Sequence, residues 1–445
     1  MRLDFGERTM DVGTSAFNFV RTVMVAGTEA AEINECLRAA DKIRANDNES
    51  WVREWASLAE DVNRTADRAM RAGRTVTARQ AYLRASNYYR AAMLSLPHTD
   101  GRLDQYLTSS RECFHEAAKV LSPPIEVVSI PFGAAHLPGY FLSAGKPNRP
   151  TLLVLNGGDS TNEEMVHWFG FAAVARGWNC MTFEGPGQWS ALQSNPGLLM
   201  RPDYEVPVQA VIDYLVQRDD VDPARIALYG PSLGSHLAAR TAAFEKRLCA
   251  CICSGLVVDV YEAWHAVWPR VLQNSPPYIF DFVFSLLEKA SPQLRGLANR
   301  FRWMLGASRP HEIIEAWRPY NISDLAPKIG CPVLALYGEA ELAQSNERVA
   351  LSALRFIAAL NCPVTVRIFQ FDQGWAASHC QMGALAPMQA LVFDWLDKVA
   401  AGTELAPRRD VGNSFDVIQR YLRGGESRRE ADDLIKRMHT GAVAG

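Results

Sequence analysis

Residues 226–236 read IALYGPSLGSH, and in this stretch an apolar strand changes into a helix around one serine. Ile226 to Tyr229 favour a buried strand, and the residues from Leu233 onwards favour a helix. The GxSxG sequence between them is typical of a turn that strains the backbone of its serine and exposes the hydroxyl above a sheet. The flanking glycines allow neighbouring backbone to approach closely. Because GxSxG also arises by chance, Ser232 is a candidate nucleophile that the rest of the chain must support.

Outward from this turn, short β-rich segments alternate with helical ones from residue 123 onwards. Such alternation predicts a mostly parallel sheet covered on both faces. The first two strands are joined by a short turn, so we expect them to be antiparallel. Helices are predicted at 162–176, 204–218, 233–245, 344–360 and 383–399. The predicted strands lie in IEVVSIPF, GYFLSAG, TLLVLNGG, NCMTFEGPG, RIALYG, ACICSGLVV, PVLALYG and TVRIFQF.

The chain outside this sheet divides into three further regions. Residues 1–122 read as helical throughout, with no strand signal, and are predicted to form an N-terminal helical domain. Residues 258–327 are helical and aromatic and interrupt the sheet, which suggests a lid over a site at the strand ends. The sheet-forming core is thus expected in two parts, 123–257 and 328–402. The polar tail, 403–445, contains one possible helix at SFDVIQRYLRG and is either a docking segment or mobile.

The composition narrows the class of protein. The 445 residues are 48% hydrophobic and 21% charged, with a net charge of −3, so neither nucleic acid nor an anionic membrane is the expected partner. The start, MRLDFGERTM, lacks the apolar run of a secretory signal, and no stretch has 18 consecutive apolar residues. Nine cysteines without a CxxC pair indicate reduced thiols. We expect a cytoplasmic protein without a metal or a cofactor.

A serine nucleophile requires a base and an acid that orients the base, and both have candidates in the expected chain order. His379 lies in a loop after the last predicted strand. The acid is Glu341, Glu339 or Asp372, and Glu341 is favoured because Gly338-Glu339-Ala340-Glu341 resembles a loop that presents a carboxylate after a strand.

An oxyanion hole requires two backbone N–H donors. Leu233, directly after the candidate nucleophile, provides one. Asn156-Gly157-Gly158-Asp159 follows an early strand, and Gly158 is the best candidate for the second.

Together these residues resemble the α/β-hydrolases, and more narrowly the branch that holds 2,6-dihydroxypseudooxynicotine hydrolase, FrsA-like proteins and fungal polyketide-shortening hydrolases. The resemblance covers roughly residues 75 to 400. It implies a helical domain that helps close the pocket, a homodimer, and hydrolysis of a carbon–carbon bond next to a ketone. The motifs that carry it are Arg84 to Arg90 (RASNYYR), Asn156 to Ser160 (NGGDS), Glu184 to Gln188 (EGPGQ), Gly230 to Gly234 (GPSLG) and His379 to Gln381 (HCQ).

The resemblance also implies an extra acid in the lid, since a carbon leaving group must be protonated. Glu262 lies about where the relative carries such a carboxylate, and His265 is the alternative. Where the family usually has aspartate, this chain has Glu341. The residues predicted to line the substrate pocket are Tyr88, Glu184, Trp264 and Trp268.

The first functional hypothesis is carbon–carbon bond hydrolysis of an aromatic or polyketide compound. An esterase, lactonase or thioesterase is the alternative, as is an acyl-transferring or cyclising enzyme with the same triad. A non-catalytic binding module that retains a hydrolase core is a third possibility.

Overall fold

The computed structural model describes residues 2–4, 9–11, 16–45, 47–403, 409–422 and 424–440. Parts of the predicted helical domain and of the tail therefore lie outside the described residues. No helix in the described ranges is both long and apolar enough to cross a membrane.

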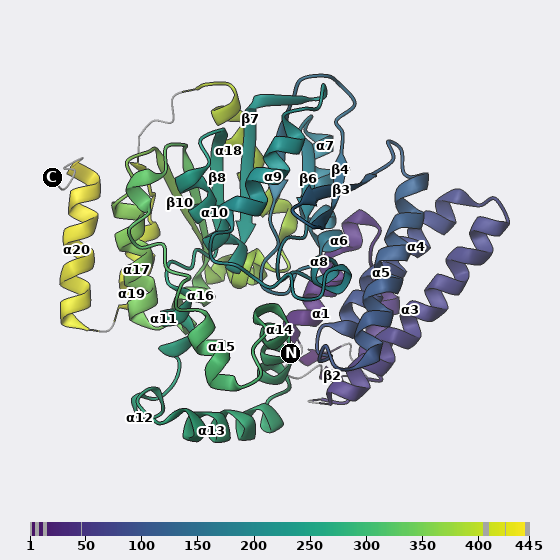
Figure 1. Ribbon diagram of the computed structural model, residues 1–445, viewed down its shortest axis with the longest axis horizontal. Helices are drawn as coiled ribbons and strands as arrows, with labels where there is room; N and C mark the ends of the chain where they lie inside the picture. Colours follow the sequence, from purple (N-terminus) through teal and green to yellow (C-terminus); the bar gives the residue numbers. More distant parts are fainter. Residues whose placement is uncertain are drawn as a thin grey trace.

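A nine-stranded sheet forms the centre of the molecule, in the order β11-β10-β9-β8-β7-β5-β6-β4-β3 (Figure 1). The pairs β3–β4 and β4–β6 are antiparallel and the other pairs are parallel, which confirms the predicted mostly parallel sheet. All eight predicted strands are present. The strands are β3 (Glu126–Phe132), β4 (Ala135–Leu142), β5 (Arg149–Val154), β6 (Asn179–Phe183), β7 (Val221–Pro231), β8 (Leu248–Ser254), β9 (Val333–Gly338), β10 (Val364–Phe369) and β11 (Arg409–Asp410).

Three short strands were not predicted. The pair β1 (Arg2–Asp4) and β2 (Thr9–Asp11) forms an antiparallel ladder, so the prediction that residues 1–122 are helical throughout was wrong at its start. The ninth strand, β11, pairs with the edge strand β10. Segments of two or three residues are too short to show the alternation of polar and apolar residues that identifies a strand.

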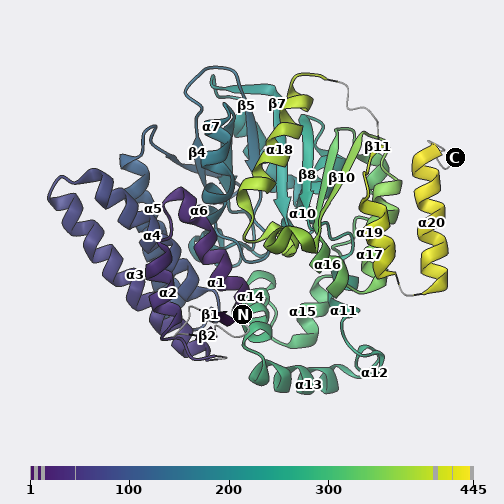
Figure 2. The ribbon, with the colours of Figure 1, turned by 180° about the vertical axis from the view of Figure 1, so that it is seen from behind.

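The helices cover both faces of the sheet (Figures 1 and 2). One hydrophobic cluster joins the N-terminal helices and α18 to one face, and a second joins α9, α10, α17 and α19 to the other. The N-terminal helices are α1 (Ala16–Val23), η2 (Met24–Thr28), α2 (Ile33–Ala40), α3 (Asn48–Arg71), α4 (Thr75–Met93) and α5 (Gly101–Val120). The core helices are α6 (Asn162–Met165), the π-helix η3 (Val166–Gly170), α7 (Phe171–Ala175), α8 (Trp189–Ser194), α9 (Glu205–Leu215), α10 (Leu233–Phe244), α16 (Glu339–Gln344), α17 (Glu347–Ala358) and α18 (Leu385–Ala400).

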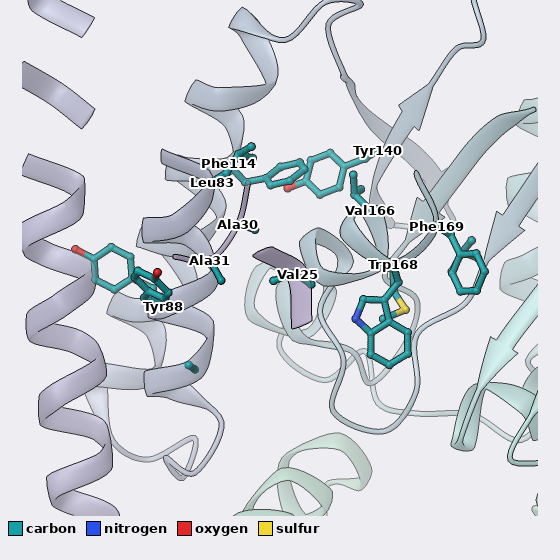
Figure 3. Close-up of a cluster of buried hydrophobic side chains, with 14 of the residues drawn as sticks. Val25, Ala30, Ala31, Leu83, Tyr88, Phe114, Tyr140, Val166, Trp168 and Phe169 are labelled. Carbon is teal, nitrogen blue, oxygen red and sulfur yellow. The ribbon is translucent and has the colours of Figure 1, made fainter. Parts of the chain in front are cut away.

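The N-terminal helices pack directly on the core through apolar side chains. Figure 3 shows Leu83, Tyr88 and Phe114 on the side of these helices and Val166, Trp168 and Phe169 on the side of the core. The rings of Phe114 in α5 and Tyr140 in β4 lie 4.7 Å apart between their centroids. The two parts thus share one continuous hydrophobic interior.

Between β8 and β9 the chain forms the insertion helices, which lie below the sheet in Figure 1. They are α11 (Val260–His265), α12 (Arg270–Gln273), α13 (Pro277–Ala290), α14 (Pro292–Leu305) and α15 (Pro310–Ala316), followed by the 3₁₀ turn η4 (Ala326–Lys328). Further 3₁₀ turns, η5 (Phe371–Ala377) and η6 (His379–Gln381), lie between β10 and α18. The helical character predicted for residues 258–327 is present.

The tail contains α19 (Ser414–Tyr421) at the predicted helical segment and a further helix, α20 (Gly425–Thr440). Phe415, Val417 and Ile418 of α19 are buried in the second hydrophobic cluster. This part of the tail is therefore docked on the core. The division of the chain into separate domains stays a prediction.

Candidate functional site

Ser232 lies between the end of β7 and the start of α10, in a backbone conformation that side chains other than glycine rarely adopt. Its φ is 54° and its ψ is −123°. The glycines on both sides are required sterically: a Cβ on Gly230 would lie 1.9 Å from the carbonyl oxygen of Gly234, and one on Gly234 would lie 2.7 Å from that of Asn156. The strained turn expected from the GxSxG sequence is thus present at Ser232.

His379 lies at the start of η6, and its Nδ1 is hydrogen-bonded to Oε1 of Glu341. The other carboxylate oxygen of Glu341 accepts the backbone N–H of Gly338 at 2.5 Å, which fixes the orientation of the carboxylate. Glu339 instead accepts the N–H of Phe371 at 2.8 Å, and Asp372 is exposed. Among the described residues, Glu341 is the only candidate acid bonded to His379.

His379 lines the pocket that also contains Ser232, and its other ring nitrogen is Nε2. Its contact is with Sγ of Cys380, at 3.6 Å, and the described part of the chain has no hydrogen bond between Ser232 Oγ and His379. Such bonds are often long in hydrolases without substrate and tighten when substrate binds. Burial opposes the charged ring, but the neighbouring charges of Cys380 and Glu341 outweigh it and raise the pKa of His379 well above its usual 6.5.

Glu341, His379 and Cys380 form the single group in the described ranges whose donor atoms are close enough to bind a metal ion. Both carboxylate oxygens of Glu341 are already hydrogen-bonded, one to His379 and one to Gly338. Only Nε2 and the thiol sulfur therefore remain available, which is a poor ligand set for a bound metal.

The candidate oxyanion loop follows β5, and Gly158 and Leu233 both line the pocket. The carbonyl of Gly158 accepts a hydrogen bond from Nε of Arg300, at 3.0 Å. Arg300 belongs to α14 of the insertion, is buried, and also donates to the carbonyl of Gly187 at 2.8 Å. Burial lowers the pKa of Arg300 to about 10.

A second buried arginine holds the same loop from the N-terminal side. Arg21 of α1 donates to Oδ2 of Asp159 at 2.9 Å and to both carboxylate oxygens of Glu164 at 2.6 Å. The loop is therefore held by two arginines, one from the N-terminal helix α1 and one from the insertion helix α14.

The pocket at Ser232 has a cavity volume of about 480 Å³ and is mostly apolar. Trp264, one of the predicted pocket residues, lines it. Arg21 and several apolar residues of the lining were not identified from the sequence, because no local motif marks them, and Cys380 was quoted only as part of the HCQ motif. These apolar residues are Phe17, Trp168, Val257, Val260, Ala263, Val267, Leu297, Phe301, Trp317 and Met382.

Three residues predicted to line the substrate pocket are placed elsewhere, which corrects those predictions. Tyr88 lies among the N-terminal helices, where its hydroxyl donates to Glu35 at 2.8 Å. Glu184 is buried and accepts backbone N–H groups, among them that of Ser190 at 2.6 Å. Trp268 packs against aromatic side chains of α13. Helical periodicity and motif membership did not indicate which of these side chains face the site.

The two candidate lid acids are not among the side chains that line the pocket. Glu262 is 29% exposed and forms an ion pair with Arg348 at 3.3 Å. His265 stacks on Tyr261, with 4.9 Å between ring centroids. Their neighbours on α11, Ala263 and Trp264, face the pocket instead.

A mostly parallel sheet with a strained serine after β7 and a carboxylate–histidine pair after β9 and β10 defines the class: this protein is an α/β-hydrolase. Residues 23–306 match the family of FrsA-like esterases, and the chain belongs to this family. The resemblance inferred from the sequence motifs is confirmed at this level.

Named relatives extend over most of the chain. Hydrolase acrC of Aspergillus aculeatus is 30% identical over 413 residues, which covers 86% of this chain and 95% of that protein. The 20-hydroxy-prefusarin hydrolase FUS2 of Gibberella moniliformis is 27% identical over 404 residues, covering 86% and 96%. The crystal structure of 2,6-dihydroxy-pseudo-oxynicotine hydrolase shares the fold, with a TM-score of 0.69 over 88% of this chain and 99% of that one, at 22% identity.

Proposed function

We propose that this protein is a serine hydrolase in which Ser232 attacks a substrate carbonyl, His379 accepts the serine proton, and Glu341 orients His379. The observation that carries this proposal is the hydrogen bond between His379 Nδ1 and Glu341 beside a strained serine that opens on the same pocket. A carboxylate bonded to Nδ1 keeps the proton on that nitrogen and leaves Nε2 free to act as the base.

The reaction follows from these positions. Attack by Oγ forms a tetrahedral intermediate, whose oxyanion is held by the N–H groups of Leu233 and Gly158. As the intermediate collapses, His379 returns its proton to the leaving atom, and an acyl-enzyme remains on Ser232. Water then attacks the acyl-enzyme with His379 again as the base, which releases the acid and restores the serine.

The substrate class that we propose is an uncharged, largely apolar small molecule. Leu297, Phe301 and Trp317 offer aliphatic and aromatic surface to such a compound. Relatives in the family carry names that refer to hydrolysis, one of them of 20-hydroxy-prefusarin, and this is consistent with a complex organic substrate. The predicted homodimer and cytoplasmic location stay predictions.

The bond that this geometry supports best is an ester or lactone bond. An oxygen leaving group needs only the proton that His379 already carries. The lining of the pocket contains no carboxylic acid besides Asp159, which is bonded to Arg21, so a separate acid that could protonate carbon is lacking among these side chains.

Carbon–carbon hydrolysis is the second candidate, and it requires Glu262 to turn from its ion pair with Arg348 towards the pocket. Glu262 lies on the same short helix as the pocket residues Ala263 and Trp264 and is held by one ion pair. Glu262→Gln separates the candidates: cleavage of a β-diketone should fall at least about tenfold while hydrolysis of an aryl ester is unchanged. Cleavage of the β-diketone by the variant at the wild-type rate would exclude Glu262 as the carbon acid, and no cleavage of it by the wild type would leave ester hydrolysis as the function.

Ser232→Ala tests the mechanism itself. Turnover should fall at least about 10⁴-fold, since the remaining residues of a triad contribute little without the nucleophile. Labelling by a fluorophosphonate should be lost in the variant and present in the wild type, and the unfolding midpoint in urea shows whether the fold is intact. Undiminished turnover by the folded variant would refute the proposed function, and the mass of the product distinguishes hydrolysis from cyclisation or acyl transfer.

A further inference from the structure

A second cavity, of about 750 Å³, adjoins the pocket at Ser232. The two share a boundary of five residues, and His379 is one of them. The shared residues are Phe17, Val257, Trp264, Val267 and His379. The catalytic histidine proposed above therefore stands between two cavities and not at the wall of a single one.

The reacting groups are distributed unequally between these cavities. Ser232, Gly158 and Leu233 line the smaller cavity alone. Glu341 lines the larger cavity alone. The smaller cavity thus contains the nucleophile and the proposed oxyanion hole, whereas the larger one lies on the side of the base and its acid.

We propose that the larger cavity binds the leaving-group half of the substrate and the smaller one its acyl half. This assignment rests on the proposed function. When the tetrahedral intermediate collapses, the bond from the carbonyl carbon to the leaving oxygen breaks, its electron pair goes to that oxygen, and the proton on His379 Nε2 moves to it. The leaving oxygen must therefore lie beside His379, and the chain attached to it extends to the side away from Ser232.

The walls of the larger cavity define the chemistry of this half. Val349, Ala350 and Ala353 of α17 form one wall, with Leu342 and Trp375 beside them. Glu341 and His379 are the only acidic or basic side chains in its lining, and they are bonded to each other. The leaving group is accordingly an uncharged and mostly apolar alcohol, large enough to occupy a cavity that exceeds the acyl cavity in volume.

Two substitutions obstruct one cavity each. Of these two cavities, Val349 lines only the larger and Leu297 only the smaller, and both side chains are partly exposed, so each tolerates a larger side chain better than a core position would. Val349→Trp and Leu297→Trp therefore form a matched pair. Ala353→Leu gives a second, smaller obstruction of the larger cavity if Val349→Trp does not fold.

The probes are two isomeric esters, octyl acetate and ethyl octanoate, which differ only in the side of the ester that carries the long chain. Val349→Trp should lower kcat/KM for octyl acetate at least about tenfold and change that for ethyl octanoate by less than about threefold. Leu297→Trp should give the reverse pattern. The unfolding midpoint of each variant in urea establishes that it is folded.

Four outcomes would overturn the assignment. If Val349→Trp lowers kcat/KM equally for both esters, the larger cavity is an entrance to the site. If Val349→Trp instead impairs ethyl octanoate and Leu297→Trp impairs octyl acetate, the larger cavity binds the acyl half and the smaller one the leaving group. Fluorophosphonate labelling of Ser232 without hydrolysis of either ester by the wild type would refute this substrate shape and leave the acyl-enzyme chemistry standing. Absence of both labelling and hydrolysis would refute the proposed function as well.

Discussion

Glu341, the proposed acid, has a longer side chain than the aspartate usual in this family, and its surroundings explain how it reaches His379. It lies in the first turn of α16, directly after β9. One carboxylate oxygen accepts the N–H of Gly338 and the other binds His379. The carboxylate is therefore oriented by backbone before any substrate binds.

Replacing Glu341 with glutamine should lower kcat and move the pH dependence of the reaction. The base must be neutral, so activity rises with pH through the pKa of His379. The charge of Glu341 contributes to raising this pKa, so the variant should reach its own plateau at lower pH. We expect kcat to fall about 10²- to 10⁴-fold. Profiles of kcat/KM against pH test both effects, with Asp372→Asn as the control, and an unshifted profile in the Glu341 variant would contradict this role.

At the scale of elements, the candidate oxyanion loop is connected to parts of the chain remote from it in sequence. The insertion helix α14 contributes Arg300 and the N-terminal helix α1 contributes Arg21. The guanidinium of Arg300 also lies 4.2 Å above the ring of Trp189, which restricts its position further. The insertion therefore helps to fix the backbone of the loop in addition to covering the pocket.

Arg300→Lys should lower kcat with little change in KM. Lysine keeps the positive charge, but it cannot donate in two fixed directions to the carbonyls of Gly158 and Gly187. A loosened Gly158 peptide would weaken stabilisation of the oxyanion, by about tenfold to 10²-fold in rate, which is less than the loss of a whole donor. Inhibition by a trifluoromethyl ketone, which forms a tetrahedral anion on the serine, should weaken in parallel.

Arg302→Lys is the matched control for this experiment. It lies on the same helix and forms an ion pair with Glu288 at 2.7 Å, remote from the loop. Both rate and inhibition should remain near the wild-type values. A raised KM with unchanged kcat in the Arg300 variant would indicate a role in binding and not in orienting the loop.

At the scale of the whole molecule, the sequence predicted what depends on local pattern and missed what depends on long-range packing. The eight strands and the chain order of Ser232, Glu341 and His379 follow from short motifs and alternation. Phe17 and Arg21 reach the pocket from α1, more than 200 residues before Ser232 in the chain, because the N-terminal helices pack on the core. Tyr88 belongs to a motif of the family and serves this packing instead. The side of a helix that meets a site is decided by such packing, and sequence periodicity does not reveal it.

Packing on the two faces of the sheet buries one histidine on each, so the fold should lose stability in acid. His167 of η3 contacts Oγ1 of Thr28 at 3.0 Å, and burial lowers its pKa to about 3. His236 of α10 is likewise lowered by burial, to about 4. Since the unfolded chain binds these protons below pH 6.5 and the folded one does not, the free energy of unfolding falls as the pH drops below 6.5, by up to about 1.4 kcal/mol per unit for each histidine.

His167→Gln should remove one of these contributions, so that the loss between pH 7 and pH 5 shrinks by about 2 kcal/mol in urea unfolding. Wild type and the His167 variant should show the same pH dependence of the free energy of unfolding between pH 7 and pH 8. Equal decreases of this free energy in the two proteins between pH 7 and pH 5 would show that His167 takes up its proton without unfolding.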